Sequence, residues 1–135
     1  MKYFIITFIT GLALVFLLLN NPIITGQVIA TTPVYETLAP ITFNEQSQQG
    51  TLLDIRTPQE FNSGRILGSS NIDFYSPNFE EKLDSLDKSE TYYIYCRTGS
   101  RTSQTLTLMR ELGFQNVYEL EGGITNWASQ GLPIY

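Results

Sequence analysis

The pattern of apolar and polar positions divides the chain of 135 residues into three parts. Residues 3–19 are uncharged and largely apolar, and the stretch that follows is rich in Thr, Pro and small residues. Because that stretch shows no periodic apolar face, we expect residues 31–40 to form an extended tether. Beyond it, short apolar runs alternate with segments whose apolar residues recur every three or four positions. The pattern therefore predicts a leader over residues 1–30, the tether, and a folded domain over residues 41–135.

Four segments of the domain have the pattern of strands. A short strand is expected at residues 41–43, followed by a helix that Asn44 caps and that runs to about Gln49. The other three are apolar, aromatic or β-branched runs of the kind found in buried strands, at residues 51–55, 91–95 and 116–120.

Helix signals lie between these strands. Thr57, Pro58 and Glu60 form a capping box with proline at the first helical position. Further helices are expected from Ser76-Pro77 with Phe79, Leu83 and Leu86 on one face, over residues 100–112 with Gly113 as a left-handed stop, and over residues 124–130. Alternating strands and helices predict an α/β fold with a parallel sheet and helices on both faces.

The apolar run near the N-terminus predicts export. Its length is at the lower limit for a membrane span and exceeds most signal-peptide cores. Two interpretations stay open: cleavage after Ala30 as a signal peptide, or retention as an N-terminal anchor helix in the membrane. Lys2 precedes the run and the next basic residue is Arg56, so the positive-inside bias sends the rest across the cytoplasmic membrane. We expect a periplasmic or extracellular protein, or one anchored by its N-terminus.

Composition and charge exclude several classes of function. Eight Lys and Arg against thirteen Asp and Glu give a formal net charge of −5, which argues against a nucleic-acid-binding surface. The chain has no His, so catalysis by a Cys–His or Ser–His pair is not available and a transition-metal site is not expected. Its single cysteine, Cys96, rules out an intramolecular disulfide and a cysteine-based zinc site.

Cys96 is the candidate for covalent chemistry. It follows the expected strand 91–95, and ligands of open parallel sheets bind at the carboxyl ends of strands. The loop that follows leads into a helix, so its backbone N–H groups, the helix dipole, and the charges of Arg97 and Arg101 should lower the thiol pKa. Gly99 allows the backbone to bend there. The alternatives are a small buried hydrophobic residue at Cys96 and solvated surface charges at the two arginines.

Four segments of the domain carry a further pattern: Leu53–Arg56 with Glu60-Phe61 and Gly64-Arg65-Ile66, then Gly68 with Asn71-Ile72, the loop Cys96–Arg101, and finally Leu120–Ile124 with Trp127. With these segments in this order, residues 41–135 resemble the rhodanese family of sulfurtransferases. The segment Cys96–Arg101 matches the active loop of that family in full. One departure is Arg65, where many members have His; it lies outside the loop, so we expect it to change packing or local charge more than chemistry.

The resemblance implies a rhodanese-like fold and a sulfurtransferase activity. It makes Cys96 the catalytic nucleophile that carries a persulfide, with sulfur moving in two covalent steps from thiosulfate or a persulfide donor to cyanide or a thiol. Neither a metal nor an organic cofactor is implied, and we expect a monomer. The sulfane sulfur and the anionic donor would be bound by Arg97, Thr98, Gly99, Ser100 and Arg101, and the structural positions would be Asp54, Arg56, Glu60 and Trp127.

Two other functions remain as alternatives. Cysteine-dependent phosphatases share an anion-binding loop, but theirs has five residues between Cys and Arg, whereas four separate Cys96 from Arg101. A smaller loop fits a sulfur atom better than a tetrahedral phosphate and its line of attack. The second alternative is a non-catalytic rhodanese-like module of the cell envelope that binds a partner or carries sulfur.

Overall fold

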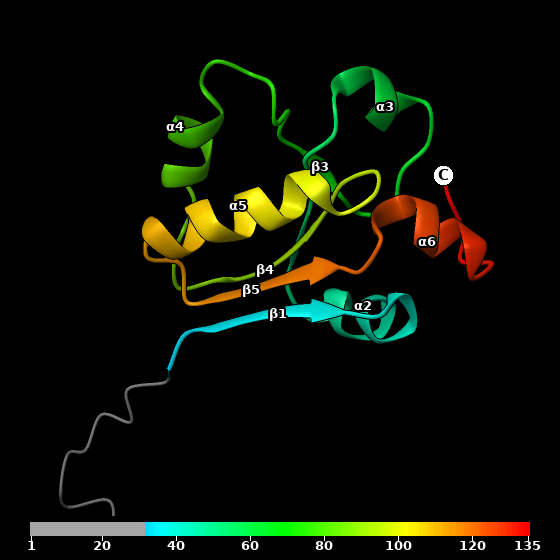
Figure 1. The fold of residues 1–135 in the computed structure, drawn as a ribbon, viewed down its shortest axis with the longest axis horizontal. Helices are drawn as coiled ribbons and strands as arrows, with labels where there is room; N and C mark the ends of the chain where they lie inside the picture. Colours follow the sequence, from blue (N-terminus) through cyan, green and yellow to red (C-terminus); the bar gives the residue numbers. More distant parts are fainter. Residues whose placement is uncertain (1–31) are drawn as a thin grey trace, which may run out of the picture. The chain divides into compact units, whose positions relative to one another are not determined.

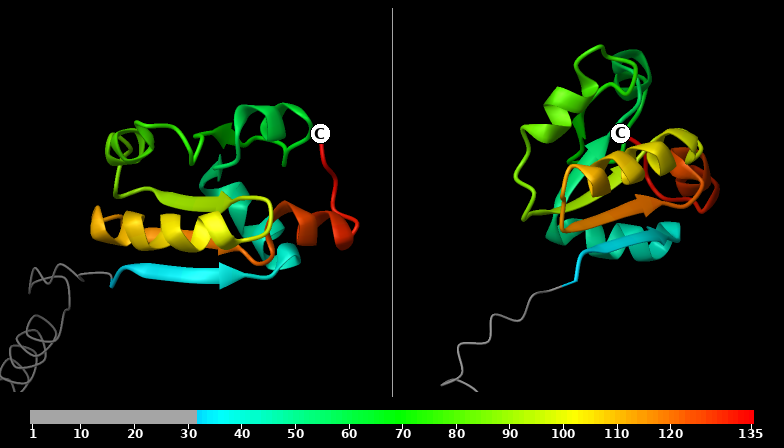
Figure 2. Two further views of the ribbon diagram at one scale, coloured as in Figure 1. Left: turned by 45° about the horizontal axis from the view of Figure 1, so that its top comes forward. Right: turned by 60° about the vertical axis from the view of Figure 1, so that its left-hand side comes forward.

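A computed structural model describes residues 32–135, which form one parallel sheet with helices on both of its faces (Figures 1 and 2). The strand order is β1-β5-β4-β2-β3. The strands are β1 (Val34–Leu38), β2 (Thr51–Asp54), β3 (Ser70–Asn71), β4 (Thr91–Tyr95) and β5 (Asn116–Leu120). The α/β fold predicted from the sequence is therefore confirmed. The expected leader, residues 1–30, lies outside the described residues, and residues 32–135 contain no helix long and apolar enough to span a membrane.

The helices are short except for α5. They are α2 (Pro40–Gln46), the 3₁₀ turn η2 (Ser47–Gln49), α3 (Pro58–Asn62), α4 (Phe79–Asp84), α5 (Ser100–Glu111) and α6 (Gly123–Ser129). α5 ends as the sequence predicts, because Gly113 has a φ of +89° and the buried Phe114 packs back behind the last turn.

Two apolar cores, one on each face of the sheet, hold the helices in place. On one face Phe79 and Leu83 of α4 and Met109 of α5 pack against Leu53 and Ile94. On the other face Phe43 of α2 and Trp127 of α6 pack against Leu52, Tyr93 and Tyr95. Neighbouring residues such as Leu52 and Leu53 belong to opposite cores because side chains alternate along a strand.

The structure corrects two expectations at the start of the domain. Val34–Leu38 does not lie in a tether but forms β1, which pairs in parallel with β5 from Val34 opposite Asn116 to Leu38 opposite Leu120. The expected strand at residues 41–43 is wrong as well. Pro40 stands at the start of α2, where its missing N–H is not needed, and the helix places Phe43 in the core, with no exposed surface, edge-on to Tyr93 and Trp127.

Two smaller differences lie between β2 and β4. The helix expected from Ser76-Pro77 begins at Phe79, because Ser76–Phe79 forms a turn in which the Phe79 N–H bonds the Ser76 carbonyl at 3.0 Å. The two-residue strand β3 had no signal in the sequence. It adds an edge to the sheet by pairing Ser70 with Leu53 and Asn71 with Asp54.

Candidate active site

Cys96 directly follows β4, at the carboxyl edge of the sheet. Its side chain is fully buried, and the loop to α5 folds back over it so that the Gly99 N–H donates to Sγ at 3.1 Å. Sγ also lies 4.0 Å from Oγ1 of Thr102, which itself donates to the Gly99 carbonyl at 2.8 Å. Gly99 adopts a φ of +101°, the left-handed region that side chains rarely occupy. The loop geometry therefore depends on glycine at this position.

Backbone N–H groups favour the thiolate of Cys96. Burial acts to raise the pKa of the thiol, but hydrogen bonds from the backbones of Thr102, Gly99, Thr98 and Arg101 outweigh it, and the pKa is lowered from its ordinary value. A thiolate is the nucleophilic form of cysteine. The loop therefore supplies the activation that a neighbouring histidine provides in other cysteine enzymes.

The Arg101 side chain binds Glu60 of α3. Its guanidinium donates to Oε2 at 2.8 Å and to Oε1 at 2.9 Å, and it is almost completely buried. The bonds from Arg101 hold the pKa of Glu60 at about 2, and the same bonds raise the pKa of Arg101. The charge of Cys96 raises the pKa of Arg101 more weakly than Glu60 does. Arg101 therefore interacts with the Cys96 thiolate only through its charge, whereas its hydrogen bonds are made to Glu60 of α3.

Glu60 links the start of α3 to the start of α5. Besides binding Arg101, its Oε2 accepts from the N–H of Thr57 at 3.0 Å, and Thr57 Oγ1 accepts from the Glu60 N–H at 3.3 Å. The predicted capping box is thus confirmed. A structural position for Glu60 followed from the resemblance, but its pairing with Arg101 joins residues 41 positions apart, and no local pattern in the sequence indicates it.

Asp54 and Arg56 form a buried ion pair behind the site. The Asp54 carboxylate accepts from the Arg56 N–H and Nε, both at 2.9 Å, and from Nη2 at 2.5 Å. Nη2 also donates to the Gly64 carbonyl at 2.7 Å. Asn71 completes the group by donating to the carbonyls of Asp54 and Arg56. These contacts brace the connection from β2 to α3. Trp127 lies in the apolar core that also contains Phe43 and Tyr95, and it donates to the Pro133 carbonyl at 3.0 Å.

The start of α6 supports the loop from behind. The Ile124 N–H donates to the Cys96 carbonyl at 2.9 Å and the Thr125 N–H to the Arg97 carbonyl at 3.1 Å. Gly123 permits this contact, because a Cβ there would lie 2.5 Å from the Cys96 carbonyl oxygen and 2.6 Å from that of Arg97. Gly123 belongs to the segment Leu120–Ile124 that resembles the family, but no local pattern in the sequence indicates its contact with the active loop.

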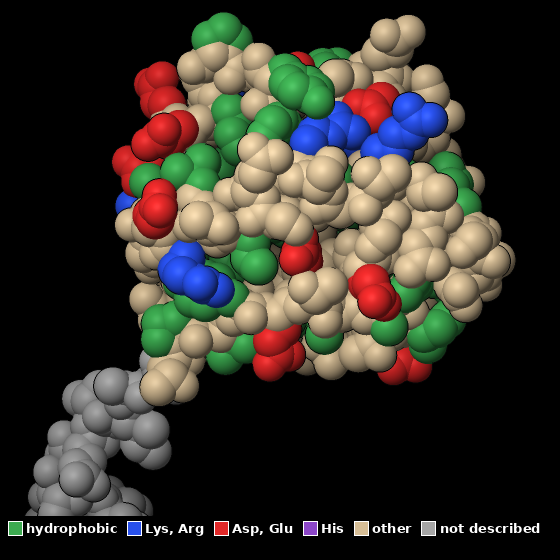
Figure 3. All heavy atoms as spheres, in the orientation of Figure 1, with side chains coloured by type: hydrophobic (Ala, Val, Ile, Leu, Met, Phe, Trp, Pro, Cys, Tyr) green, Lys and Arg blue, Asp and Glu red, His purple; other side chains and the backbone are tan. Residues whose placement is uncertain are grey.

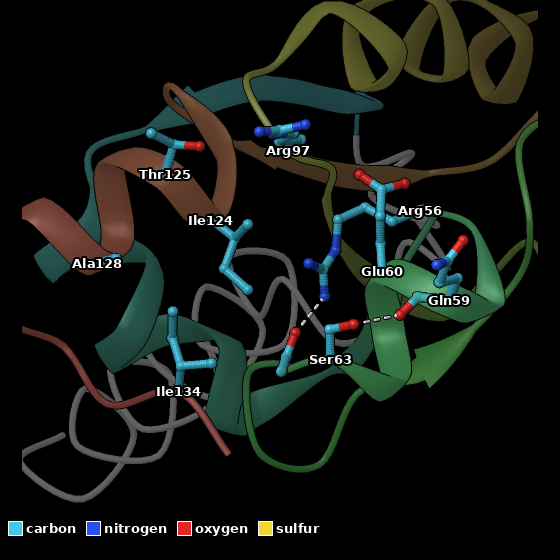
Figure 4. Close-up of a pocket in the computed structure, with 10 residues that line it drawn as sticks. Arg56, Gln59, Glu60, Ser63, Arg97, Ile124, Thr125, Ala128 and Ile134 are labelled. Carbon is cyan, nitrogen blue, oxygen red and sulfur yellow. Dashed lines mark hydrogen bonds between the residues drawn. The ribbon is translucent and has the colours of Figure 1, made fainter.

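The loop reaches, through Arg97, an open pocket of about 590 Å³ between α3 and α6 (Figure 4). Arg97, Thr98 and Ser100 are exposed, and Arg97 lines the pocket. Figure 4 shows Ile124 and Ile134 on one side of the hollow, Arg56, Glu60 and Ser63 on the other, and Arg97 above them. In Figure 3 basic side chains, with an acidic one among them, gather between α3 and the start of α5. The site therefore offers positive charge to an anion although the protein carries a net negative charge.

Comparison with known proteins assigns the family. Residues 40–130 match the Rhodanese-like domain family. The chain belongs to that family. Its rhodanese-like domain is 32% identical over 91 residues to thiosulfate sulfurtransferase 16 of the chloroplast of Arabidopsis thaliana, covering 60% of this chain and 76% of the relative. It is 35% identical over 83 residues to a sulfurtransferase of Allochromatium vinosum, covering 62% of this chain and 76% of the relative.

A solved structure agrees with this assignment. The rhodanese-related protein of Thermoplasma volcanium superimposes with a TM-score of 0.68 at 29% identity, over 75% of this chain and 98% of the other. The resemblance noted in the sequence is confirmed, and sulfurtransferase relatives support a function in sulfur transfer in general.

Proposed function

We propose that the protein is a rhodanese-type sulfurtransferase that carries sulfane sulfur on Cys96. The observation that carries the proposal is the buried Cys96 thiol, whose pKa is lowered by backbone N–H groups at the carboxyl end of β4. A sulfur atom attached to Sγ would meet the same donors, which would stabilise the negative charge of a persulfide. The donor would be thiosulfate or a persulfide, and the acceptor cyanide or a thiol.

The reaction proceeds in two displacements. The Cys96 thiolate attacks the outer sulfur of thiosulfate, a new S–S bond forms, and the old S–S bond breaks with its electron pair leaving on sulfite. Cyanide then attacks the outer sulfur of the persulfide and leaves as thiocyanate, while the electron pair of the broken bond returns to Sγ as thiolate. Both steps conserve atoms and charge without a proton donor, which suits a site built from backbone N–H groups.

Replacement of Cys96 by serine tests the proposal. Cys96→Ser should lower thiosulfate:cyanide turnover by a factor of roughly 10³ or more, because the hydroxyl is not ionised near neutral pH. The thermal unfolding midpoint should change little, since serine is close to cysteine in size. The wild-type protein incubated with thiosulfate should gain the mass of one sulfur atom, and the variant should not.

Three results would contradict this function. If Cys96→Ser retained turnover, Cys96 would not be the nucleophile. A wild-type protein that neither gains sulfur nor turns over would support the non-catalytic binding module. Hydrolysis of an aryl phosphate by Cys96 in place of sulfur transfer would support the phosphatase.

We also propose that the domain acts outside the cytoplasm. Lys2 before the apolar run, and the absence of further basic residues up to Arg56, support this orientation. The intact mass of the native protein after cell fractionation tests it. A mass lacking residues 1–30 supports a cleaved signal peptide, a full-length mass in the membrane fraction supports an anchor, and a full-length protein in the cytoplasm contradicts the proposal.

A further inference from the structure

We infer that Tyr75 is a positioning residue of the active site, which acts on Cys96 through Arg101. The ring of Tyr75 covers the Arg101 guanidinium, keeps water from it, and so preserves the effect of its positive charge on the Cys96 thiolate. The inference rests on the proposed function, which makes Cys96 the nucleophile. Three observations carry it: the position of the ring, the support behind the ring, and the burial of Arg101.

The ring of Tyr75 lies over the Arg101 guanidinium. Cζ of Arg101 is 5.6 Å from the ring centroid, within the distance of about 6 Å at which a cation is attracted to an aromatic face. Tyr75 belongs to the segment between β3 and α4. The contact therefore adds a third element to the pair that Arg101 of α5 forms with Glu60 of α3. Tyr75 itself is 67% exposed, so it contributes little to the apolar core.

Neighbouring side chains hold the ring in this place. The Tyr75 N–H donates to Oδ1 of Asp73 at 3.0 Å, which fixes the turn after β3. The ring packs edge-on against Phe74 with the centroids 5.3 Å apart, and Phe74 packs at the same distance against Phe79 of the core. The exposed ring is thus anchored to the fold through these contacts.

Arg101 is enclosed between Glu60 and Tyr75. The titratable groups that face its guanidinium are Glu60 from α3, Tyr75 from the segment after β3, and Cys96 at the end of β4. Two hydrogen bonds from Arg101 to Glu60 fix the guanidinium, and Arg101 is only 9% exposed. Because Arg101 acts on Cys96 by charge alone, the strength of this effect depends on how much water surrounds the guanidinium. A side chain that excludes water there strengthens the effect.

The thiol pKa of Cys96 in the full-length protein is the deciding measurement. The chain has one cysteine, so the ultraviolet absorbance of the thiolate, taken as the difference between each protein and its Cys96→Ser counterpart, reports this group alone in a pH titration. Tyr75→Leu keeps an apolar side chain and removes the aromatic face. It should raise the measured pKa by about 0.5, which lowers the thiolate fraction about threefold at pH values well below the pKa. Tyr75→Phe keeps the face and should retain the pKa of wild type.

Two comparisons assign the effect to Arg101. Tyr135 is 59% exposed and its ring covers no guanidinium within residues 32–135, so Tyr135→Leu should leave the pKa of Cys96 unchanged. In a protein that already carries Arg101→Gln, Tyr75→Leu should have no further effect, because the charge through which the ring acts is gone.

Four results would overturn the inference: a wild-type pKa in Tyr75→Leu, an equal shift in Tyr75→Phe, an equal shift in Tyr135→Leu, or an undiminished shift in the Arg101→Gln background. If Arg101→Gln did not fold, the other three comparisons would still decide. Turnover of thiosulfate and cyanide is measured on the same proteins. If wild type showed no turnover, the proposed function would fail while the titration still decided the role of Tyr75. If wild type were active and Tyr75→Leu had an unchanged pKa, only this inference would fail.

Discussion

At the scale of single residues, Cys96 is governed by a balance between burial and backbone hydrogen bonding. The side chain has no exposed surface, which opposes ionisation, and N–H groups of the loop and of the first turn of α5 reverse that effect. The donors are backbone groups, so their positions depend on the path of the chain more than on side-chain identity. Residues that fix this path, Gly99 and Gly123, therefore matter as much to the site as the side chains around it.

Gly123 should tolerate alanine poorly. Gly123→Ala forces a left-handed residue and places Cβ within 2.5–2.6 Å of the backbone of Cys96 and Arg97. Gly131 has a similar φ, +74°, with nothing near its Cβ position, so Gly131→Ala serves as the control. It should cost about 1 kcal/mol of unfolding free energy in urea, for the backbone conformation alone. Gly123→Ala should cost at least about 2 kcal/mol more and lower kcat/KM. If both variants lost the same unfolding free energy, the active loop would shift to accommodate the Cβ at no cost in stability, and the prediction would be wrong.

At the scale of elements, strands with a local signal were predictable and those defined by distant partners were not. The aromatic and β-branched run of β4, the mixed run of β5, and the apolar repeat and glycine stop of α5 specify their elements within the segment itself. β1 has no such signal, because it is short, contains the exposed Glu36 and follows Thr and Pro. Its stability comes from pairing with β5, some eighty residues away. The same reasoning applies at the site. Cys96 and its loop were predictable from their position after a strand, whereas the Glu60–Arg101 pair and the contact of α6 with the loop needed the fold.

The link between α3 and α5 should make stability depend on pH. Arg101 holds the pKa of Glu60 at about 2, below its ordinary value of 4.5. Because the folded-state pKa is depressed, the stabilisation is fully present above pH 4.5 and is lost as the pH falls towards 2. The difference in unfolding free energy between wild type and Glu60→Gln should therefore be constant at neutral pH and shrink in that acidic range.

A matched control separates this ion pair from general acid effects. Glu45 is exposed on α2 and forms no ion pair within residues 32–135, so Glu45→Gln should differ little from wild type at any pH. The unfolding free energies of wild type and Glu60→Gln could instead differ by a constant amount down to pH 2. That result would contradict the assigned role of Arg101.

At the scale of the whole molecule, the site is assembled from both ends of the described chain. The active loop joins β4 to α5 in the middle of the sheet, α6 supports it from behind, and β1 closes the sheet beyond β5. Leu38 at the end of β1 is buried in the same core as Trp127, and the Glu121 N–H, two residues before Gly123, donates to the Leu38 carbonyl at 2.9 Å. The first strand thus supports the turn that holds the active loop, so a boundary drawn at residue 41 would cut into the domain.

Two fragments test this boundary. A fragment of residues 32–135 contains all five strands, both apolar cores and every contact of the site, so it should unfold cooperatively and retain the kcat/KM of the full chain. A fragment of residues 41–135 lacks β1, which leaves β5 as an open edge, removes the buried Leu38 and Pro40, and leaves buried Glu119 without the 2.9 Å bond from Thr37. These losses should lower the unfolding free energy by roughly 3 kcal/mol or more. Circular dichroism in urea and turnover with thiosulfate and cyanide measure both effects. If the shorter fragment matched the longer one in stability and turnover, β1 would be dispensable and the domain would begin at α2; if the longer fragment were itself unfolded, residues before 32 would be part of the fold.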